Sequence, residues 1–159
     1  MSERFLVTGA LGCIGSWACR QLVREGADVI ALDAGGSDHR LRQILEPDEL
    51  AGLARVDCDI TDLTRLSSIV ADGVTHVVHL AALQVPFCRA NPSLGASVNV
   101  VGTVNVFEAA RRRANRMAGL SSVGVRPMTV YGVGRDQGMT SGPTKAIVSA
   151  VLEPIATPR

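Results

Sequence analysis

Three residues in the last third of the sequence are of types that can transfer protons. In the stretch LSSVGVRPMTVYGVGR, residues 120–135, Ser122 precedes Tyr131, and Arg135 follows that tyrosine by four positions. A serine, a tyrosine and a nearby cation form a candidate acid–base centre, because the cation lowers the pKa of the tyrosine. Arginine is a poor member of such a centre, since its guanidinium stays protonated and differs in reach from a lysine ammonium.

The clearest binding motif is the glycine-rich segment TGALGCIG, which lies between an expected strand and an expected helix. Gly9, Gly12 and Gly15 are spaced G-x-x-G-x-x-G. The first glycine permits a tight turn, the second lets a pyrophosphate approach the backbone, and the third lets helix and strand pack closely. The positive end of the helix that follows then faces the phosphates. The motif predicts a dinucleotide site.

An acidic residue in the right place supports this prediction. Asp33 ends the second expected strand, 18 residues after Gly15. A carboxylate there accepts hydrogen bonds from the adenosine ribose and repels a 2′-phosphate, which favours NAD over NADP. The alternative for Asp33 is a turn former before two glycines. His39 and Arg40 lie close by in the sequence and can alter the preference.

The order of the expected elements predicts an α/β fold. Valine- and leucine-rich runs alternate with segments of helical periodicity, which indicates a Rossmann-like, doubly wound parallel sheet in three α/β/α layers. Hydrophobic residues make up 47% and aromatics only 3%, which is typical of such a core. The expected strands are Arg4–Thr8, Asp28–Leu32, Ala54–Cys58, Val74–Leu80 and Ser122–Arg126, and the expected helices are Gly12–Glu25, Leu41–Leu45, Asp62–Val70, a long helix from Pro92 to about Arg113, and Ser141–Leu152.

Several details of these elements are predicted as well. The run Val74–Leu80 is the most hydrophobic and is expected at the centre of the sheet. The first helix is expected to direct Ile14, Ala18 and Leu22 towards the core. Asn91 is expected to cap the long helix, with proline at its first position.

Charge and hydropathy exclude several classes of partner. The chain has 16 basic and 15 acidic residues and a net charge of +1, so neither nucleic acid nor an anionic membrane is expected as a partner. The first residues pass directly into a strand, and no run approaches the roughly 18 apolar residues of a membrane span. We therefore expect a cytoplasmic protein.

Cysteine and histidine spacing gives no metal motif. The four cysteines form no C-x-x-C pair, so reduced thiols are expected. His76 and His79 are three positions apart on an expected strand, which directs their side chains to opposite faces. No metal site is expected.

Four segments, taken in chain order, resemble the motifs of one known family. TGALGCIG, DCDITD (57–62), HLAA (79–82) and NVVGTVNVFEAAR (99–111) resemble motifs of the extended short-chain dehydrogenases, the NAD-dependent sugar-nucleotide epimerase/dehydratase family. The resemblance covers residues 4–113 and implies NAD as cofactor. It places the adenine beside Asp59 and Ile60, and it gives Asn99 the role of steadying the active site. The NAD-binding residues implied are Gly9, Gly12, Cys13, Ile14, Gly15, Asp33, Asp59, Ile60, Leu80, Ala81, Ala82 and Asn99.

The resemblance also implies an activity, oxidoreduction-based epimerisation or dehydration of a nucleotide sugar, and a possible homo-oligomer through the long helix. The family uses a catalytic serine and a Tyr-x-x-x-Lys pair. Tyr131 is the only tyrosine here and Lys145 the only lysine, so that pair is absent. Residues 123–135 instead resemble a later family segment, in which Arg135 is a candidate substrate-binding residue.

We therefore interpret residues 1–159 as a single NAD-binding domain, truncated on its C-terminal side. Residues 1–120 form the dinucleotide-binding core, and residues 121–159 are the remnant of a later strand and a substrate-side helix after an internal deletion. Ser122–Arg126 is then expected to pair in parallel with Val74–Leu80.

Three alternatives remain open. Ser122 and Tyr131 can form a degenerate active site. The chain can instead be a non-catalytic NAD-binding remnant or regulatory module, which the absent Tyr-x-x-x-Lys pair favours. It can also be an interaction protein that uses only a helix face of the scaffold.

Overall fold

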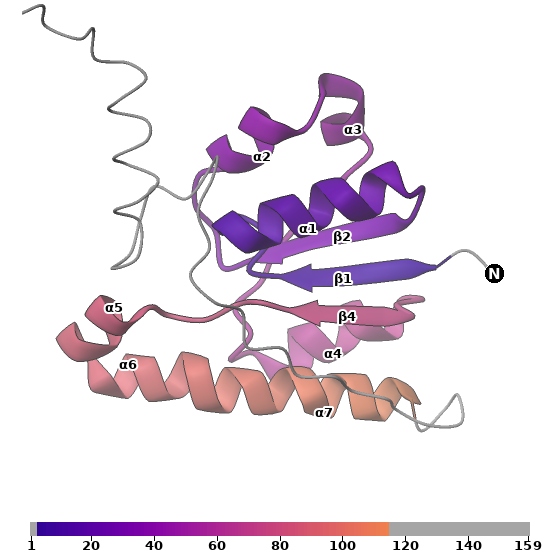
Figure 1. Ribbon diagram of the computed structural model, residues 1–159. Coiled ribbons are helices and arrows are strands. Elements are labelled where there is room, and N and C mark those ends of the chain that lie inside the picture. Colours follow the sequence, from indigo (N-terminus) through magenta and orange to yellow (C-terminus); the bar gives the residue numbers. More distant parts are fainter. Residues whose placement is uncertain (1–2, 115–159) are drawn as a thin grey trace, which may run out of the picture.

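The computed structural model describes residues 3–114, and its strands form one parallel sheet (Figure 1). The strands are β1 (Arg4–Thr8), β2 (Asp28–Asp33), β3 (Ala54–Asp57) and β4 (His76–His79). Their order is β3-β2-β1-β4, and each neighbouring pair is parallel. The predicted Rossmann-like parallel sheet is confirmed over these residues.

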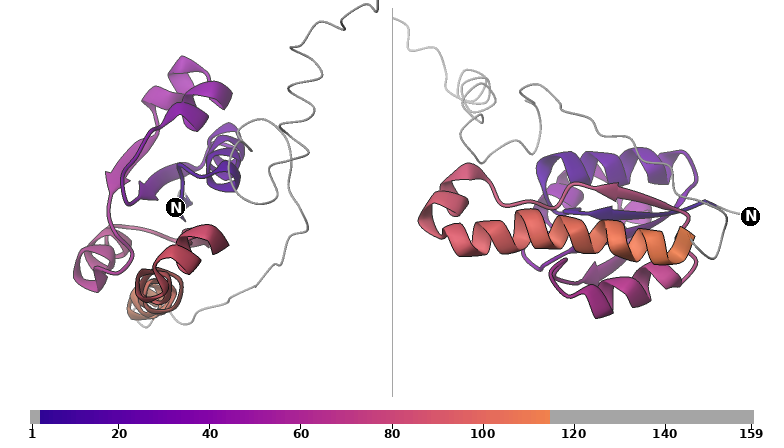
Figure 2. Two further views of the ribbon diagram at one scale, coloured as in Figure 1. Left: turned by 90° about the vertical axis from the view of Figure 1, so that its left-hand side faces the viewer. Right: turned by 90° about the horizontal axis from the view of Figure 1, so that it is seen from below.

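Helices cover both faces of the sheet. They are α1 (Cys13–Arg24), α2 (His39–Ile44), α3 (Pro47–Ala51), α4 (Leu63–Ala71), α5 (Val85–Ala90), α6 (Pro92–Ala96), the π-helical segment η1 (Ser97–Gly102) and α7 (Thr103–Ala114). Figures 1 and 2 show α1, α2 and α3 on one side of the sheet, and α4 and α7 on the other. This is the predicted three-layer arrangement.

The alternation of apolar residues along the two inner strands creates these two covered faces. Leu6 and its β2 neighbours Ile30 and Leu32 join the core beneath α4 and α7. Val7 packs with Val29 on the opposite face, in the core beneath α1 and α2. Successive side chains of a strand point to opposite faces, so the period of two in the sequence fills both layers.

The first helix directs two of its three predicted residues towards the core, and Ile14 is the exception. Gly15, Ser16 and Cys19 are buried on α1, whereas Ile14 is 39% exposed. Ala18 and Leu22 pack partly against the core, as expected. The absence of a side chain at Gly15 lets the helix lie directly on the end of β1, which rotates Ile14 outward.

Two short helices were not predicted from the sequence. Pro47 occupies the first position of α3, where a missing N–H is harmless. A capping box supports that start, because the Glu46 and Glu49 side chains each bond the other's backbone N–H. The second unpredicted helix is α5, with Pro86 near its start. Neither proline was interpreted from the sequence as the start of a helix.

The long helix is confirmed in extent but is not uniform. Asn91 caps it, accepting from the Leu94 N–H at 3.0 Å. Its middle, η1, is π-helical rather than α-helical, a distortion that is frequent at functional sites. A Cβ at Gly102 would lie 2.6 Å from the Ile60 side chain, so this glycine allows the helix to approach the end of β3.

The fourth strand is shorter than predicted. β4 covers His76–His79, and within residues 3–114 it pairs with β1 and is last in the strand order. β4 was predicted to lie at the centre of the sheet, but among the described strands it lies at the edge. A central position for β4 would require a further strand from the residues after 114. Ser122–Arg126 and Ser141–Leu152 lie outside the described residues. Within residues 3–114 no helix has the length and apolar character needed to cross a bilayer.

Candidate functional site

The loops that carry the sequence motifs meet at one edge of the sheet. Because β1 to β4 are parallel, their carboxyl ends lie together, and this edge is where open α/β sheets bind ligands. The glycine loop follows β1, Asp33 ends β2, the DCDITD segment follows β3, and HLAA follows β4. The topology thus brings together four motifs that are far apart in the sequence.

The glycine loop is packed too closely for side chains at two positions. Gly9 has a φ of +69°, and a Cβ there would lie 2.7 Å from the Ala81 nitrogen. A Cβ at Gly15 would lie 2.0 Å from the Gly9 carbonyl oxygen. At Gly12 a built Cβ would lie 3.1 Å from that carbonyl oxygen, which is tight, but no other described neighbour comes within 4 Å. The first and third glycines serve packing, and the second leaves open space beside the start of α1.

The flanking residues of the loop have different surroundings. Cys13 is half-buried at the first position of α1, and its carbonyl accepts from the Ser16 hydroxyl at 3.0 Å. Ile14, which follows it, is exposed. Burial raises the pKa of the thiol of Cys19, six residues after Cys13 on the same helix, to about 12. Cys19 is therefore a core residue rather than a reactive thiol.

Two backbone groups fix the carboxylate of Asp33. Its Oδ2 accepts from the Leu11 N–H at 2.9 Å, and its Oδ1 accepts from the Ala34 N–H at 2.9 Å. Each carboxylate oxygen can accept a further hydrogen bond. Arg40 donates to the Leu11 carbonyl at 3.1 Å, which ties α2 to the same loop. Asp33 is thus held at the junction of β2 and the glycine loop.

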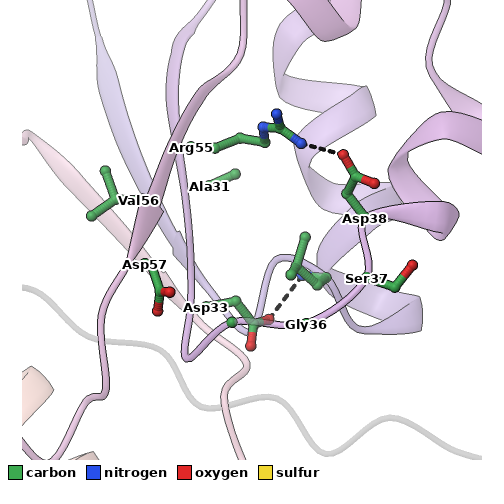
Figure 3. A pocket seen from close by; sticks show the side chains of 10 residues that line it. Ala31, Asp33, Gly36, Ser37, Asp38, Arg55, Val56 and Asp57 are labelled. Carbon is green, nitrogen blue, oxygen red and sulfur yellow. Dashed lines mark hydrogen bonds and ion pairs between the residues drawn. The ribbon is translucent and has the colours of Figure 1, made fainter.

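A cleft of about 440 Å³ opens beside this carboxylate (Figure 3). Its described lining carries three carboxylates, from Asp33, Asp38 and Asp57, and one guanidinium, from Arg55. Asp38 pairs with Arg55 and with Arg42. The hydrogen bond from Arg42, together with the Arg55 charge, holds the pKa of Asp38 below its usual range. The other lining residues are Leu11, Ala31, Gly35, Gly36, Ser37 and Val56.

Asp59 and Ile60 of the DCDITD segment, which were predicted to contact the adenine, have different surroundings. Asp59 Oδ1 accepts from the Thr61 N–H at 2.8 Å, which closes the turn. The Ile60 side chain is 3% exposed and lies in the core. Its carbonyl accepts from Asn105 Nδ2 at 3.0 Å, and the same nitrogen donates to the Thr61 carbonyl. Ile60 therefore presents backbone, not its side chain, at this edge.

The HLAA segment is bonded to the end of β1. Thr8 Oγ1 accepts from the N–H groups of Leu80 and Ala81, at 3.1 and 3.3 Å. The same hydroxyl lies 2.7 Å from His79 Nδ1. Because backbone N–H groups can only donate, the hydroxyl hydrogen is left for Nδ1, and His79 must carry its proton on Nε2. Burial lowers the pKa of His79, in keeping with this neutral form.

The protonated nitrogen of His79 extends the network to the long helix. Nε2 lies 3.0 Å from Thr103 Oγ1, and the Thr103 hydroxyl donates to the Asn99 carbonyl at 2.9 Å. The Asn99 side chain in turn bonds both backbone polar groups of Leu83. A continuous chain of hydrogen bonds thus joins β1, β4 and η1. It places Asn99 beside the segment that follows Ala82.

Some site residues were missed, and others cannot be placed. Asn105, only 8% exposed, interrupts the apolar face of α7, and such a polar residue in a buried stripe was a signal for a hydrogen-bonding role. Asp57 and the Asp38–Arg55 pair gave no signal, since only the fold brings β3 and α2 to one cleft.

Ser122, Tyr131 and Arg135 lie outside the described residues. No group of three metal-ligating side chains occurs within residues 3–114.

Comparisons with known proteins give relatives of one kind. The NAD dependent epimerase/dehydratase family matches residues 5–125. A UDP-glucose 4-epimerase of Mycolicibacterium smegmatis is 37% identical over 112 residues, which cover 68% of this chain and 34% of that protein. A dTDP-glucose 4,6-dehydratase of Mycobacterium tuberculosis is 36% identical over 122 residues, 75% of this chain and 36% of that protein. The chain thus spans about a third of the length of these relatives.

Solved structures agree. The dTDP-glucose 4,6-dehydratase of Streptomyces venezuelae, with NAD and TYD bound, superposes with a TM-score of 0.60 at 32% identity, over 70% of this chain and 37% of that one. The UDP-glucose 4-epimerase of Thermus thermophilus in complex with NAD gives 0.59 at 29% identity, over 70% and 35%. The matched motifs, the sheet order and these relatives lead to one conclusion: the chain belongs to the NAD-dependent epimerase/dehydratase family.

Proposed function

We propose that the chain binds NAD along the carboxyl edge of its sheet. The observation that carries the proposal is the Asp33 carboxylate, which Leu11 and Ala34 fix beside an open cleft. Its remaining lone pairs can accept from the two hydroxyls of an adenosine ribose. The adenine then lies in the cleft, near the backbone of Asp59 and Ile60.

The remaining parts of the dinucleotide fit the same edge. The open space at Gly12 admits a pyrophosphate against the backbone, at the positive end of the 12-residue helix α1. Leu80, Ala81 and the exposed Ala82 then run beside the nicotinamide half. Asn99 orients this half indirectly, because it holds the loop at Leu83. Bound NAD supplies a hydride acceptor; these residues bind and orient it.

The family suggests the activity, epimerisation or dehydration of a nucleotide sugar with transient oxidation by NAD. A different candidate, a non-catalytic NAD-binding module, is favoured by one observation: the sequence has no Tyr-x-x-x-Lys pair. General acid–base catalysis contributes about 10²–10⁴-fold to a rate. We therefore expect turnover of UDP-glucose and dTDP-glucose to be absent or very slow. Robust turnover that is lost in Tyr131→Phe would restore Ser122 and Tyr131 as an active site, with Arg135 in place of lysine.

Cofactor titrations test the proposal. Fluorescence titration of the chain with NADH and NADPH is expected to give distinctly tighter binding of NADH, because Asp33 repels a 2′-phosphate. Asp33→Ala should narrow the gap between the two cofactors. Asp48→Ala is a matched control, since Asp48 lies on α3, outside the cleft lining. Equal affinities in the unmodified chain would remove the role of Asp33, and absence of NADH binding would remove the proposal itself.

A homo-oligomer and a cytoplasmic location also belong to the proposal. Val100, Val104 and Phe107 are 61%, 60% and 51% exposed and, at spacings of four and three, share one face of the long helix. An exposed apolar stripe of this kind suits a second copy of the chain. Sedimentation with Val104→Glu, which is expected to shift dimers to monomers, tests this contact. None of the four cysteines, all of which lie within residues 3–114, forms a disulfide, which agrees with a reducing compartment.

A further inference from the structure

An aspartate at the start of α2 does not cap its helix. Asp38 occupies the N-cap position, where an aspartate ordinarily accepts from a backbone N–H of the first turn, yet it makes no such bond. Its carboxylate pairs instead with Arg42 Nε, at 2.8 Å, and with Arg55 Nη1. The Asp38 side chain is 19% exposed. The Asp38 carboxylate therefore serves to pair with these two guanidiniums and not to cap the helix.

The partner that matters is Arg55, because it lines the nucleotide cleft. Arg55 lies on β3 opposite Ala31, two residues before Asp57. Figure 3 shows its guanidinium directed towards Asp38, across the cleft from the carboxylates of Asp33 and Asp57. Among the described residues that line the cleft, it is the one cation. Its side chain is half exposed, 50%, so it is accessible to a ligand.

A guanidinium in an adenosine-binding cleft can raise the affinity of the site for NADP. Arginine binds phosphate through paired, charge-assisted hydrogen bonds, and NADP differs from NAD by one phosphate on the adenosine ribose. A cation in this cleft would therefore favour the wrong cofactor for a site that contains Asp33. The Asp38 carboxylate weakens this attraction, because it offsets the charge of Arg55 and accepts from its Nη1.

We propose that Asp38 is a second determinant of NAD selectivity, which acts by pairing with Arg55 and so withholding that cation from a 2′-phosphate. The inference rests on the proposed NAD site and deepens it. Asp33 discriminates by repulsion, and Asp38 discriminates by weakening an attraction. Arg55 is then a latent phosphate-binding residue of the same cleft.

Titrations of charge-neutral variants test this. Asp38→Asn retains the shape and a good N-cap residue, and it releases Arg55. We expect NADPH affinity to rise by roughly fivefold, the scale of one partly exposed ion pair, while NADH affinity changes less than twofold. In the Arg55→Gln background, Asp38→Asn should leave NADPH affinity unchanged, because the released cation is gone. Asp48→Asn, on α3, controls for the loss of one negative charge.

The ratio of the two affinities is the readout, since a partly unfolded sample weakens both equally. Asp38→Ser, with another favourable N-cap residue, repeats the test if the asparagine variant folds poorly. An unchanged ratio in both variants would overturn the inference, as would an equal rise in the Arg55→Gln background. Absence of NADH binding in every variant, the unmodified chain included, would instead overturn the proposed NAD site.

Discussion

The side-chain amide of Asn99 satisfies both backbone polar groups of Leu83: Oδ1 accepts from its N–H at 2.7 Å, and Nδ2 donates to its carbonyl at 2.9 Å. Nδ2 also lies 3.4 Å from Cys88 Sγ. This two-point contact joins the π-helical turn to the loop after β4, a loop that has no strand partner at Leu83 to use. An amide suits this position, because its oxygen accepts and its NH2 group donates from two separate atoms at the end of one short side chain.

Asn99→Ala should therefore destabilise the fold by about 2 kcal/mol, since two hydrogen bonds of roughly 1 kcal/mol each are lost. Asn99→Asp should also destabilise it, because a second carboxylate oxygen would face the Leu83 carbonyl in place of a donor. Urea unfolding followed by circular dichroism measures both. Ser97→Ala, on the same helical turn, is the control. An Asn99→Ala variant as stable as that control would show that the contact is incidental.

Gly15→Ala should damage the glycine loop although alanine favours helices. The added Cβ would lie 2.0 Å from the Gly9 carbonyl oxygen, and this neighbour is backbone, so the loop itself must move. We expect a loss of about 1–3 kcal/mol of stability, as for other overpacked sites, together with weaker NADH binding. Gly52→Ala is the matched control, because a Cβ there meets its nearest atom at 3.7 Å. Thermal unfolding that does not separate the two variants would contradict the packing described here.

His79 should make stability depend on pH. Burial lowers its pKa from the ordinary 6.5, so below about pH 6.5 the unfolded chain binds a proton more readily than the folded one. The stabilisation from neutral His79 is thus complete above pH 6.5 and is lost as the pH falls below it. His79→Gln should cost more stability at pH 7.5 than at pH 5.5, measured by urea unfolding. His76→Gln, on the same strand but exposed, is the control. A cost for His79→Gln that is equal at both pH values would contradict the lowered pKa of His79.

Much of this fold could be predicted from local patterns. The bounds of β1 were predicted correctly, because apolar alternation and a following glycine turn are both local signals. The end of β2 at Asp33 and the cap at Asn91 were also correct for local reasons. The outward rotation of Ile14 was missed, since it depends on how closely Gly15 lets a helix approach a strand. Contacts across more than one element, such as Asp38 with Arg55, have no signature in one sequence.

The candidate site divides in the same way. The glycine spacing and Asp33 were visible because each acts through its own backbone conformation or its place at a strand end. The links from Thr8 through His79 to Thr103 were not, because they need β1, β4 and α7 in register. From the sequence, His79 was only set aside as a metal ligand. The structure shows that it links Thr8 to Thr103 by hydrogen bonds.

Hydrogen–deuterium exchange with and without saturating NADH is the most direct test of the NAD site. We expect slower exchange in residues 9–15, where the pyrophosphate would lie against the loop, and in residues 34–37, which border the cleft beside Asp33. Residues 47–51, which form α3 on the far side of α2 from the loop, should exchange at an unchanged rate. Protection of the first two segments alone would place the cofactor as proposed. NADH that binds without protecting either segment, or that fails to bind at all, would contradict the site.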